Sequence, residues 1–146
     1  MSATPSPGTV PGPSYAGQRL GLPEQGPGSV VGWGRRIAAL FVDWIASELV
    51  VSALVRLGVV NLPGWESWLT MLVFLLEASV LTALVGGSFG QLALRIAVVR
   101  LDRRPVNLLV ALVRTALICL VVPPVIYNRD RRGLHDLATG TVTVRR

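Results

Sequence analysis

The sequence predicts an all-α membrane protein, a small multi-pass helical bundle with two clear transmembrane helices, a third membrane-embedded apolar helix and a short cytoplasmic β-pair. Hydrophobic residues make up 51% of the 146 residues, and charged residues make up only 15%. The apolar residues gather into runs that begin near positions 35, 68 and 106. The first run has roughly the 20 residues that an α-helix needs to cross a hydrocarbon core of about 30 Å.

The chain is strongly basic, with a formal net charge of +6 and 14 basic residues, all of them arginine. Because the arginines flank the apolar runs, membrane topology and anionic lipid explain them better than nucleic acid. We therefore expect the lipid bilayer as a partner and no nucleic acid. Cys119 lies inside an apolar run, where a buried structural thiol is expected. Since no Cys/His cluster or plausible catalytic triad is present, we expect no metal, no cofactor, no catalytic residue and no enzymatic activity.

Residues 1–32 are rich in proline, glycine and serine and lack apolar periodicity. Such a segment cannot bury enough surface to fold, so we expect a disordered tail followed by a transmembrane domain at residues 33–146. We interpret the tail as solubilising, with a proline-rich ligand motif as the alternative.

The first apolar run covers about residues 37–55 and follows Trp33, an aromatic residue of the kind found at membrane interfaces. Asp43 comes seven residues after Arg36, so in a helix the two lie on one face, two turns apart. Because an aspartate that faces lipid is energetically costly, this face is expected to point toward protein or water.

A turn at residues 57–67 leads to the second apolar run, at about 68–86, where glycines end the helix. Residues 94–101 are short, β-branched and interspersed with arginine. We interpret them as a strand or hairpin on the membrane surface, with an amphipathic helix as the alternative. Residues 141–144 have the pattern of a short strand that pairs with residues 94–99.

The third apolar run covers residues 106–127 and contains Pro123-Pro124, which breaks the helix near its end. Arg35 and Arg36 place the N-terminus in the cytoplasm by the positive-inside rule, and the protein is expected in the cell membrane. A third full crossing would place the arginine-rich C-terminal tail outside. The proline break permits the segment to turn back, and we favour a cytoplasmic tail over an external one.

Three blocks of the chain resemble those of the RDD family of bacterial membrane proteins, which is named for one arginine and two aspartates. The first is RRIAALFVDWI, with Arg36 and Asp43. The second is GGSFGQLALRIAVV, and the third is VRTALICLVVPP followed by RRGLHDLATGTVTV, with Arg114 and Asp136. The resemblance covers about residues 33–144. It implies a membrane protein. Transport of some ligand has been suggested for the family as a whole.

Two details qualify the resemblance. The family's glycine-rich block often reads Gly-Lys where this chain has Gly90-Gln91, so a role that rests on the lysine is not carried over. A proline-rich tail before such a domain is similar to an actinobacterial arrangement.

The family motif charges Arg36, Asp43 and Asp136 form the first candidate site. In the functional interpretation they bind a cation, or gate a transport path, at the cytoplasmic side. In the structural alternative they form a salt-bridge network that ties the first span to the tail. His135, next to Asp136, is interpreted as a surface or capping residue.

The intramembrane charges Glu48, Glu77 and Arg114 form the second candidate site. They lie at comparable depths in their segments and could meet near the midplane. Two carboxylates sharing one arginine could exchange a proton or a monovalent cation, whereas a static Glu-Arg pair is the structural alternative, which we favour slightly.

The leading functional hypothesis is a transport component for a proton, a small cation or another small ligand. One chain with three short segments hardly lines a path alone, so we expect a homo-oligomer or a membrane partner. The alternative is a non-catalytic membrane scaffold that recruits a partner through its proline-rich tail.

Overall fold

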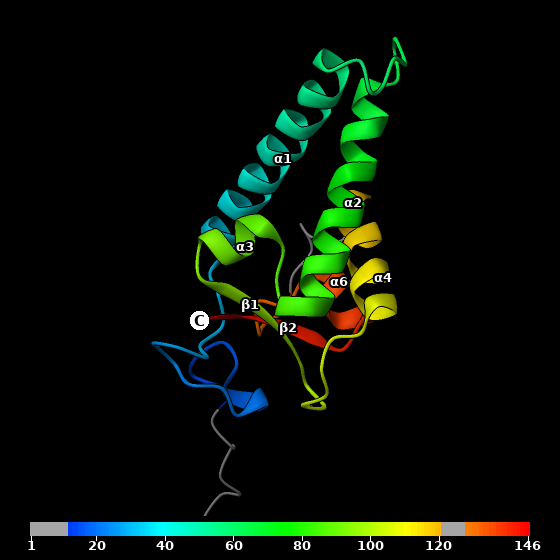
Figure 1. Ribbon diagram of the computed structural model, residues 1–146. Helices are drawn as coiled ribbons and strands as arrows, with labels where there is room; N and C mark the ends of the chain where they lie inside the picture. Colours follow the sequence, from blue (N-terminus) through cyan, green and yellow to red (C-terminus); the bar gives the residue numbers. More distant parts are fainter. Residues whose placement is uncertain (1–11, 121–127) are drawn as a thin grey trace, which may run out of the picture.

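The computed structural model describes residues 12–120 and 128–146. Two long helices, α1 (Trp33–Arg56) and α2 (Glu66–Val85), form an antiparallel hairpin, and the smaller elements gather at one end of it (Figure 1). Both helices are long and apolar enough to cross a membrane, which confirms the two long apolar helices predicted from the sequence.

The chain turns sharply after α2. Gly86 adopts a left-handed backbone with φ of 80°, and its N–H donates to the carbonyl of Thr82, which ends the helix. The short α3 (Phe89–Ala93) follows and begins with a capping box. Ser88 Oγ accepts from the Gln91 N–H, and the Gln91 side chain accepts from the Ser88 N–H. The glycines thus end the span, as predicted, and α3 packs back against α1.

A two-stranded antiparallel sheet lies beyond α3. It consists of β1 (Ile96–Arg100) and β2 (Thr141–Arg145), with Ile96 opposite Arg145 and Arg100 opposite Thr141. This confirms the predicted strand pair. It also places the C-terminal strand at the same end of the hairpin as the start of α1 (Figure 1).

β2 alternates threonine and valine, and the alternation divides the sheet between two environments. Val142 and Val144 pack with Val30 and with apolar residues of the N-terminal segment, which contains a 3-10 turn, η1 (Gln18–Leu20). Thr141 and Thr143 point to the opposite face and are 0% and 1% exposed. One strand therefore supplies a hydrophobic contact on one side and hydroxyl groups on the other.

The N-terminal segment reaches this sheet through residues 28–31. The N–H of Gly28 donates to the carbonyl of Arg145 at 2.8 Å, and the N–H of Val31 donates to that of Thr143 at 3.0 Å. The sequence-based domain boundary at residue 33 thus leaves out residues that contact β2. The predicted disorder of the tail stays a prediction, and residues 1–11 lie outside the described part of the chain.

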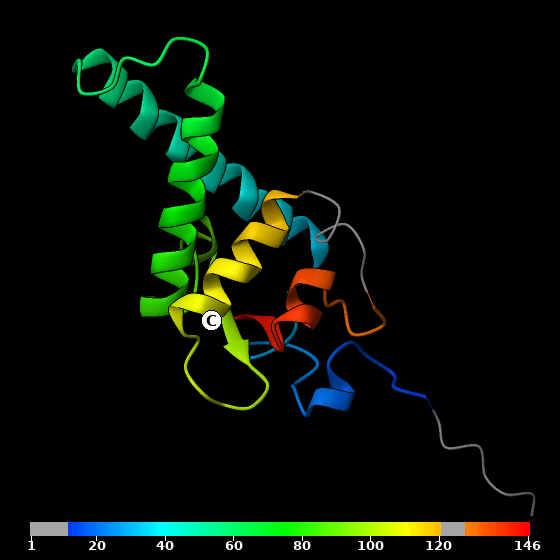
Figure 2. The same cartoon turned by 90° about the vertical axis from the view of Figure 1, so that its right-hand side faces the viewer.

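The third apolar run contains a short helix, α4 (Leu108–Cys119), which packs mainly against α2 (Figure 2). Its 12 residues span about 18 Å, so α4 alone is shorter than a membrane crossing. The predicted Pro123-Pro124 break lies outside the described residues. After residue 128 the chain forms α6 (Leu134–Ala138) and then β2.

Two parts of the molecule are distinguished below. The base consists of residues 28–43 and the described residues from 77 onward. The tip consists of residues 48–72, at the far end of the hairpin.

Candidate functional site

Asp136 is at the centre of the base and is completely buried. It belongs to α6, and its carboxylate accepts hydrogen bonds from two arginines on two other helices. Arg36 Nη1 of α1 donates to Oδ2 at 3.0 Å, and Arg114 Nε of α4 donates to Oδ1 at 3.0 Å. The hydroxyls of Thr141 and Thr143 donate to the same carboxylate at 3.1 and 3.2 Å. One carboxylate thus joins α1, α4, α6 and β2.

The electrostatic balance at this cluster favours the carboxylate. Burial by itself would raise the pKa of Asp136, but the charges of Arg114, His135 and Arg36 outweigh burial and hold the pKa well below its usual value. Because Asp136 is ionised, the two buried guanidinium groups have a fixed counter-charge. This arrangement supplies the partner that buried arginines need.

A third arginine holds the loop between α6 and β2. Arg132 Nε donates to the carbonyl of Thr141 at 2.9 Å, and Arg132 Nη2 donates to the carbonyl of Asp136 at 3.1 Å. Sequence reasoning did not single out Arg132 or the two threonines. The threonine–valine alternation of β2 was the available signal, because it puts both hydroxyls on one face.

Asp43 is held by α3. Its Oδ2 accepts from the Ser88 hydroxyl at 2.6 Å, and its Oδ1 accepts from the backbone N–H of Gly90. A Cβ atom on Gly90 would lie 2.1 Å from the carbonyl oxygen of Ala39, so only glycine permits this close approach of α3 to α1. Arg36 and Asp136 are therefore bonded to each other, as predicted. Asp43 lies next to them but bonds to Ser88 and Gly90 at the start of α3.

The structure does not bring the second predicted set together. Arg114 pairs with Asp136, whereas Glu77 accepts from the N–H of Phe89 at 2.8 Å and Glu48 accepts from the Thr70 hydroxyl at 2.8 Å. Among the described residues, no hydrogen bond or ion pair joins Arg114 to either glutamate. The physical reason is that α4 is short and starts in the base, so Arg114 faces α6 and β2.

His135 is 4% exposed, which corrects its prediction as a surface or capping residue. Its Nε2 lies 3.6 Å from Asp136 Oδ1. The sequence placed it in a turn, but the following strand and α4 cover it. His135 therefore belongs to the buried cluster.

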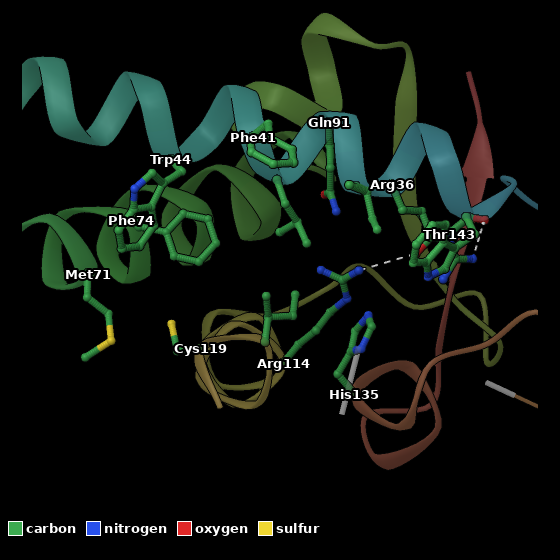
Figure 3. A pocket seen from close by; sticks show the side chains of 14 residues that line it. Arg36, Phe41, Trp44, Met71, Phe74, Gln91, Arg114, Cys119, His135 and Thr143 are labelled. Atoms are coloured by element: carbon green, nitrogen blue, oxygen red, sulfur yellow. Dashed lines mark hydrogen bonds between the residues drawn. The ribbon is translucent and has the colours of Figure 1, made fainter. Parts of the chain in front are cut away.

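A cavity of about 640 Å³ lies between α1, α2 and α4. One end is polar and the rest is apolar (Figure 3). The polar end is formed by Arg36, Gln91, Arg114, His135 and Thr143. The apolar wall is formed by Trp33, Ile37, Leu40, Phe41 and Trp44 of α1, Met71 and Phe74 of α2, and Ile118 and Cys119 of α4. The cavity thus adjoins the charged cluster directly. Searched over the described residues, no group of three or more His, Cys, Asp and Glu side chains could hold a metal ion.

Two helices that can span a membrane, with a buried Arg-Asp-Arg cluster at one end, define a small helical membrane protein with a polar base. The sequence profile of the RDD family matches residues 30–140. The chain belongs to the RDD family. Comparison with curated proteins and with solved structures yields no match for it.

Proposed function

We propose that this protein is a ligand-binding component of a membrane transport system, and that its ligand occupies the cavity between α1, α2 and α4. The observation that carries the proposal is that the two arginines bonded to Asp136, Arg36 and Arg114, line the cavity directly. Concave sites of about 300–1,000 Å³ with a few convergent polar groups are typical of small-ligand sites, and this cavity falls within that range.

The charges around the cavity favour an anion over the cation expected from the sequence. Arg36 and Arg114 line the cavity, whereas Asp136 is completely buried and accepts hydrogen bonds from both of them. A ligand at the polar end would therefore meet guanidinium groups and not a carboxylate. Guanidinium groups bind carboxylates and phosphates through charge-assisted hydrogen bonds, and among the described residues the hydrogen bonds from Arg114 to Asp136 and Thr143 use only its Nε and Nη2.

A proton or a small cation is the second candidate ligand, and a different place in the base favours it. Asp43 is 1% exposed, and Glu77 Oε2 is buried with no hydrogen-bond partner among the described residues. Carboxylates at membrane depth commonly take part in proton relays. These two would act near α3 and not in the cavity.

We further propose that the protein is a non-enzymatic homo-oligomer, or part of a complex, in the cell membrane. Over the described residues, two candidate spanning helices and one shorter apolar helix enclose little on their own, which supports assembly with further helices. An N-terminus in the cytoplasm is supported by the arginines of the base, which include Arg95, Arg103 and Arg104.

The test uses the purified full chain in phosphatidylcholine vesicles, with flux measured for protons, sodium, potassium, chloride and phosphate. Anion flux that falls in Arg114→Gln but persists in Arg100→Gln supports the proposal, because Arg100 forms an exposed ion pair with Asp102. Cation or proton flux that falls in Asp43→Asn supports the second candidate. No flux, together with a stable complex that requires residues 1–32, would favour the scaffold and overturn the transport proposal.

A further inference from the structure

Building on the proposed binding role, we propose that the cavity takes a single-chain amphiphile with an anionic headgroup, of which a long-chain fatty acid is the simplest example. The headgroup would lie between Arg36 and Arg114, and the chain would lie along the apolar wall of α1. Arg36 of the family motif would then bind the headgroup of a lipid together with Arg114.

The two ends of the cavity have opposite chemistry. Figure 3 shows Arg36, Arg114 and His135 gathered at one end, with Trp44 and Met71 toward the other. An inorganic ion would use only the polar end, and a hydrocarbon would use only the wall. A ligand with one charged end and one apolar chain uses both.

The length of the wall fits one acyl chain. Trp33 and Trp44 both line the cavity and are eleven residues apart on α1, which corresponds to about 16 Å along the helix. One leaflet of a bilayer has a hydrocarbon depth of about 15 Å, half of the full core. A chain that extends across one leaflet therefore matches the wall from the arginine end to Trp44.

In the described part of the chain, the side of the cavity along α1 is exposed. Phe41 and Trp44 line it and yet are 66% and 46% exposed. Because α1 is a candidate membrane span, its open side faces lipid. A single-chain lipid can thus enter sideways from the bilayer without crossing water.

The charge of the polar end selects the headgroup. Asp136 and Asp43 are 0% and 1% exposed, so their carboxylates lie behind the lining side chains. Arg36 and Arg114 share the single negative charge of Asp136, so one positive charge of the three groups is in excess, and both guanidinium groups line the cavity. A carboxylate headgroup is therefore favoured over an alcohol and strongly favoured over an ammonium group.

Tryptophan quenching can locate the chain. The protein has four tryptophans, of which Trp33 and Trp44 line the cavity and Trp65 and Trp68 lie at the tip. Full-length variants keep one tryptophan each, with the others changed to phenylalanine, in phosphatidylcholine vesicles. A nitroxide next to the carboxylate of a fatty acid should quench Trp33 most, and a nitroxide near the methyl end should quench Trp44 most.

The variant that keeps only Trp65 measures quenching by free lipid in the bilayer. Quenching of Trp33 and Trp44 must saturate and must exceed this background. Equal quenching by a spin-labelled phosphatidylcholine would show that ordinary bilayer lipid fills the cavity, and it would overturn the proposal.

A matched pair of variants tests the wall. Leu40 lines the cavity, whereas Leu49 is 65% exposed outside it on the same helix. Leu40→Phe should weaken fatty-acid binding at least tenfold, because the larger side chain fills the cavity space along the apolar wall. Leu49→Phe should leave binding unchanged. Equal affinities of the two variants would contradict the assigned path of the chain.

The headgroup is tested at Gln91, without changing Arg36 or Arg114. Glutamate also satisfies a capping box, so Gln91→Glu keeps the start of α3 and adds a negative charge to the polar end. It should weaken fatty-acid binding about tenfold and leave binding of the matching fatty alcohol unchanged. Equal losses for acid and alcohol would refute an anionic headgroup. Binding without any flux would leave this inference intact and refute only the transport proposal.

Discussion

The base and the tip of the hairpin are stabilised in different ways. In the base, charged side chains are buried and joined to one another, with Asp136 at 0%, Arg114 at 3% and Arg36 at 9% exposure. In the tip, large apolar side chains face outward, as Leu57 at 76% and Trp68 at 62% exposure illustrate. Protein contacts therefore hold the base, whereas the tip leaves its apolar surface to the surrounding lipid.

The polar groups of the two regions show the same difference. The carboxylate of Asp136 accepts four hydrogen bonds that reach α1, α4 and β2. The tip has a single comparable contact, in which the Thr70 hydroxyl donates to Glu48 at 2.8 Å. A change in the base should consequently affect the whole fold, and a change in the tip should remain local.

The largest effect is expected from Asp136→Asn. It leaves Arg36 and Arg114 buried without their counter-charge, which should lower the free energy of unfolding by about 3–5 kcal/mol. Thermal unfolding of the purified protein, followed by tryptophan fluorescence, measures the loss. Asp102→Asn is the control, because Asp102 pairs with Arg100 at an exposed site and its loss should leave the midpoint unchanged. Similar midpoints for both variants would remove the basis of the comparison.

Gly90→Ala should have the next largest effect. The added methyl group would lie 2.1 Å from the carbonyl oxygen of Ala39 and must push α3 away from α1. We expect a loss of about 1–3 kcal/mol in the same unfolding measurement. Gly34→Ala is the matched control, since a Cβ there meets nothing within 4 Å. Equal stability of the two variants would mean that α3 is not tightly packed.

Acid should weaken the base. The pKa of Asp136 is lower in the folded protein than in the unfolded chain, so Asp136 contributes stability that is fully present above about pH 3.9 and lost as the pH falls below it. Each pH unit in that range should cost up to about 1.4 kcal/mol. Unfolding midpoints at pH 7, 5 and 3 measure the loss, and Asp136→Asn should lack this component.

The smallest effect is expected in the tip. Thr70→Val removes the hydroxyl that donates to Glu48, which should cost about 1 kcal/mol. Thr82→Val is the control, because the Thr82 hydroxyl has no hydrogen-bond partner among the described residues. If Thr70→Val lowered the free energy of unfolding as much as Asp136→Asn does, the tip would be as important for stability as the base.

The sequence predicted the elements better than it predicted their contacts. The length and apolarity of α1 and α2, and the β-branched pattern of residues 94–99 and 141–144, are local properties, and these elements are confirmed. The proximity of Arg36 and Asp136 was predicted because the strand pair brings them to one end. The partner of Arg114 could not be predicted, because it depends on where α4 begins and on how deep it lies. His135 was likewise misplaced, since its burial results from packing and not from its neighbours in sequence.

The pairing of Arg36 with Asp136 spans 100 positions of the chain and has a consequence for biosynthesis. Ribosomes add about 5–20 residues per second, so Arg36 is made roughly 5–20 s before the carboxylate that neutralises it. During that interval α1 and α2 can already be inserted, whereas the contact between Arg36 and Asp136 has not yet formed. Residues made well after α1 and α2 thus complete the base, and a chain cut before Asp136 would expose an unfinished base to the cell's quality-control proteases.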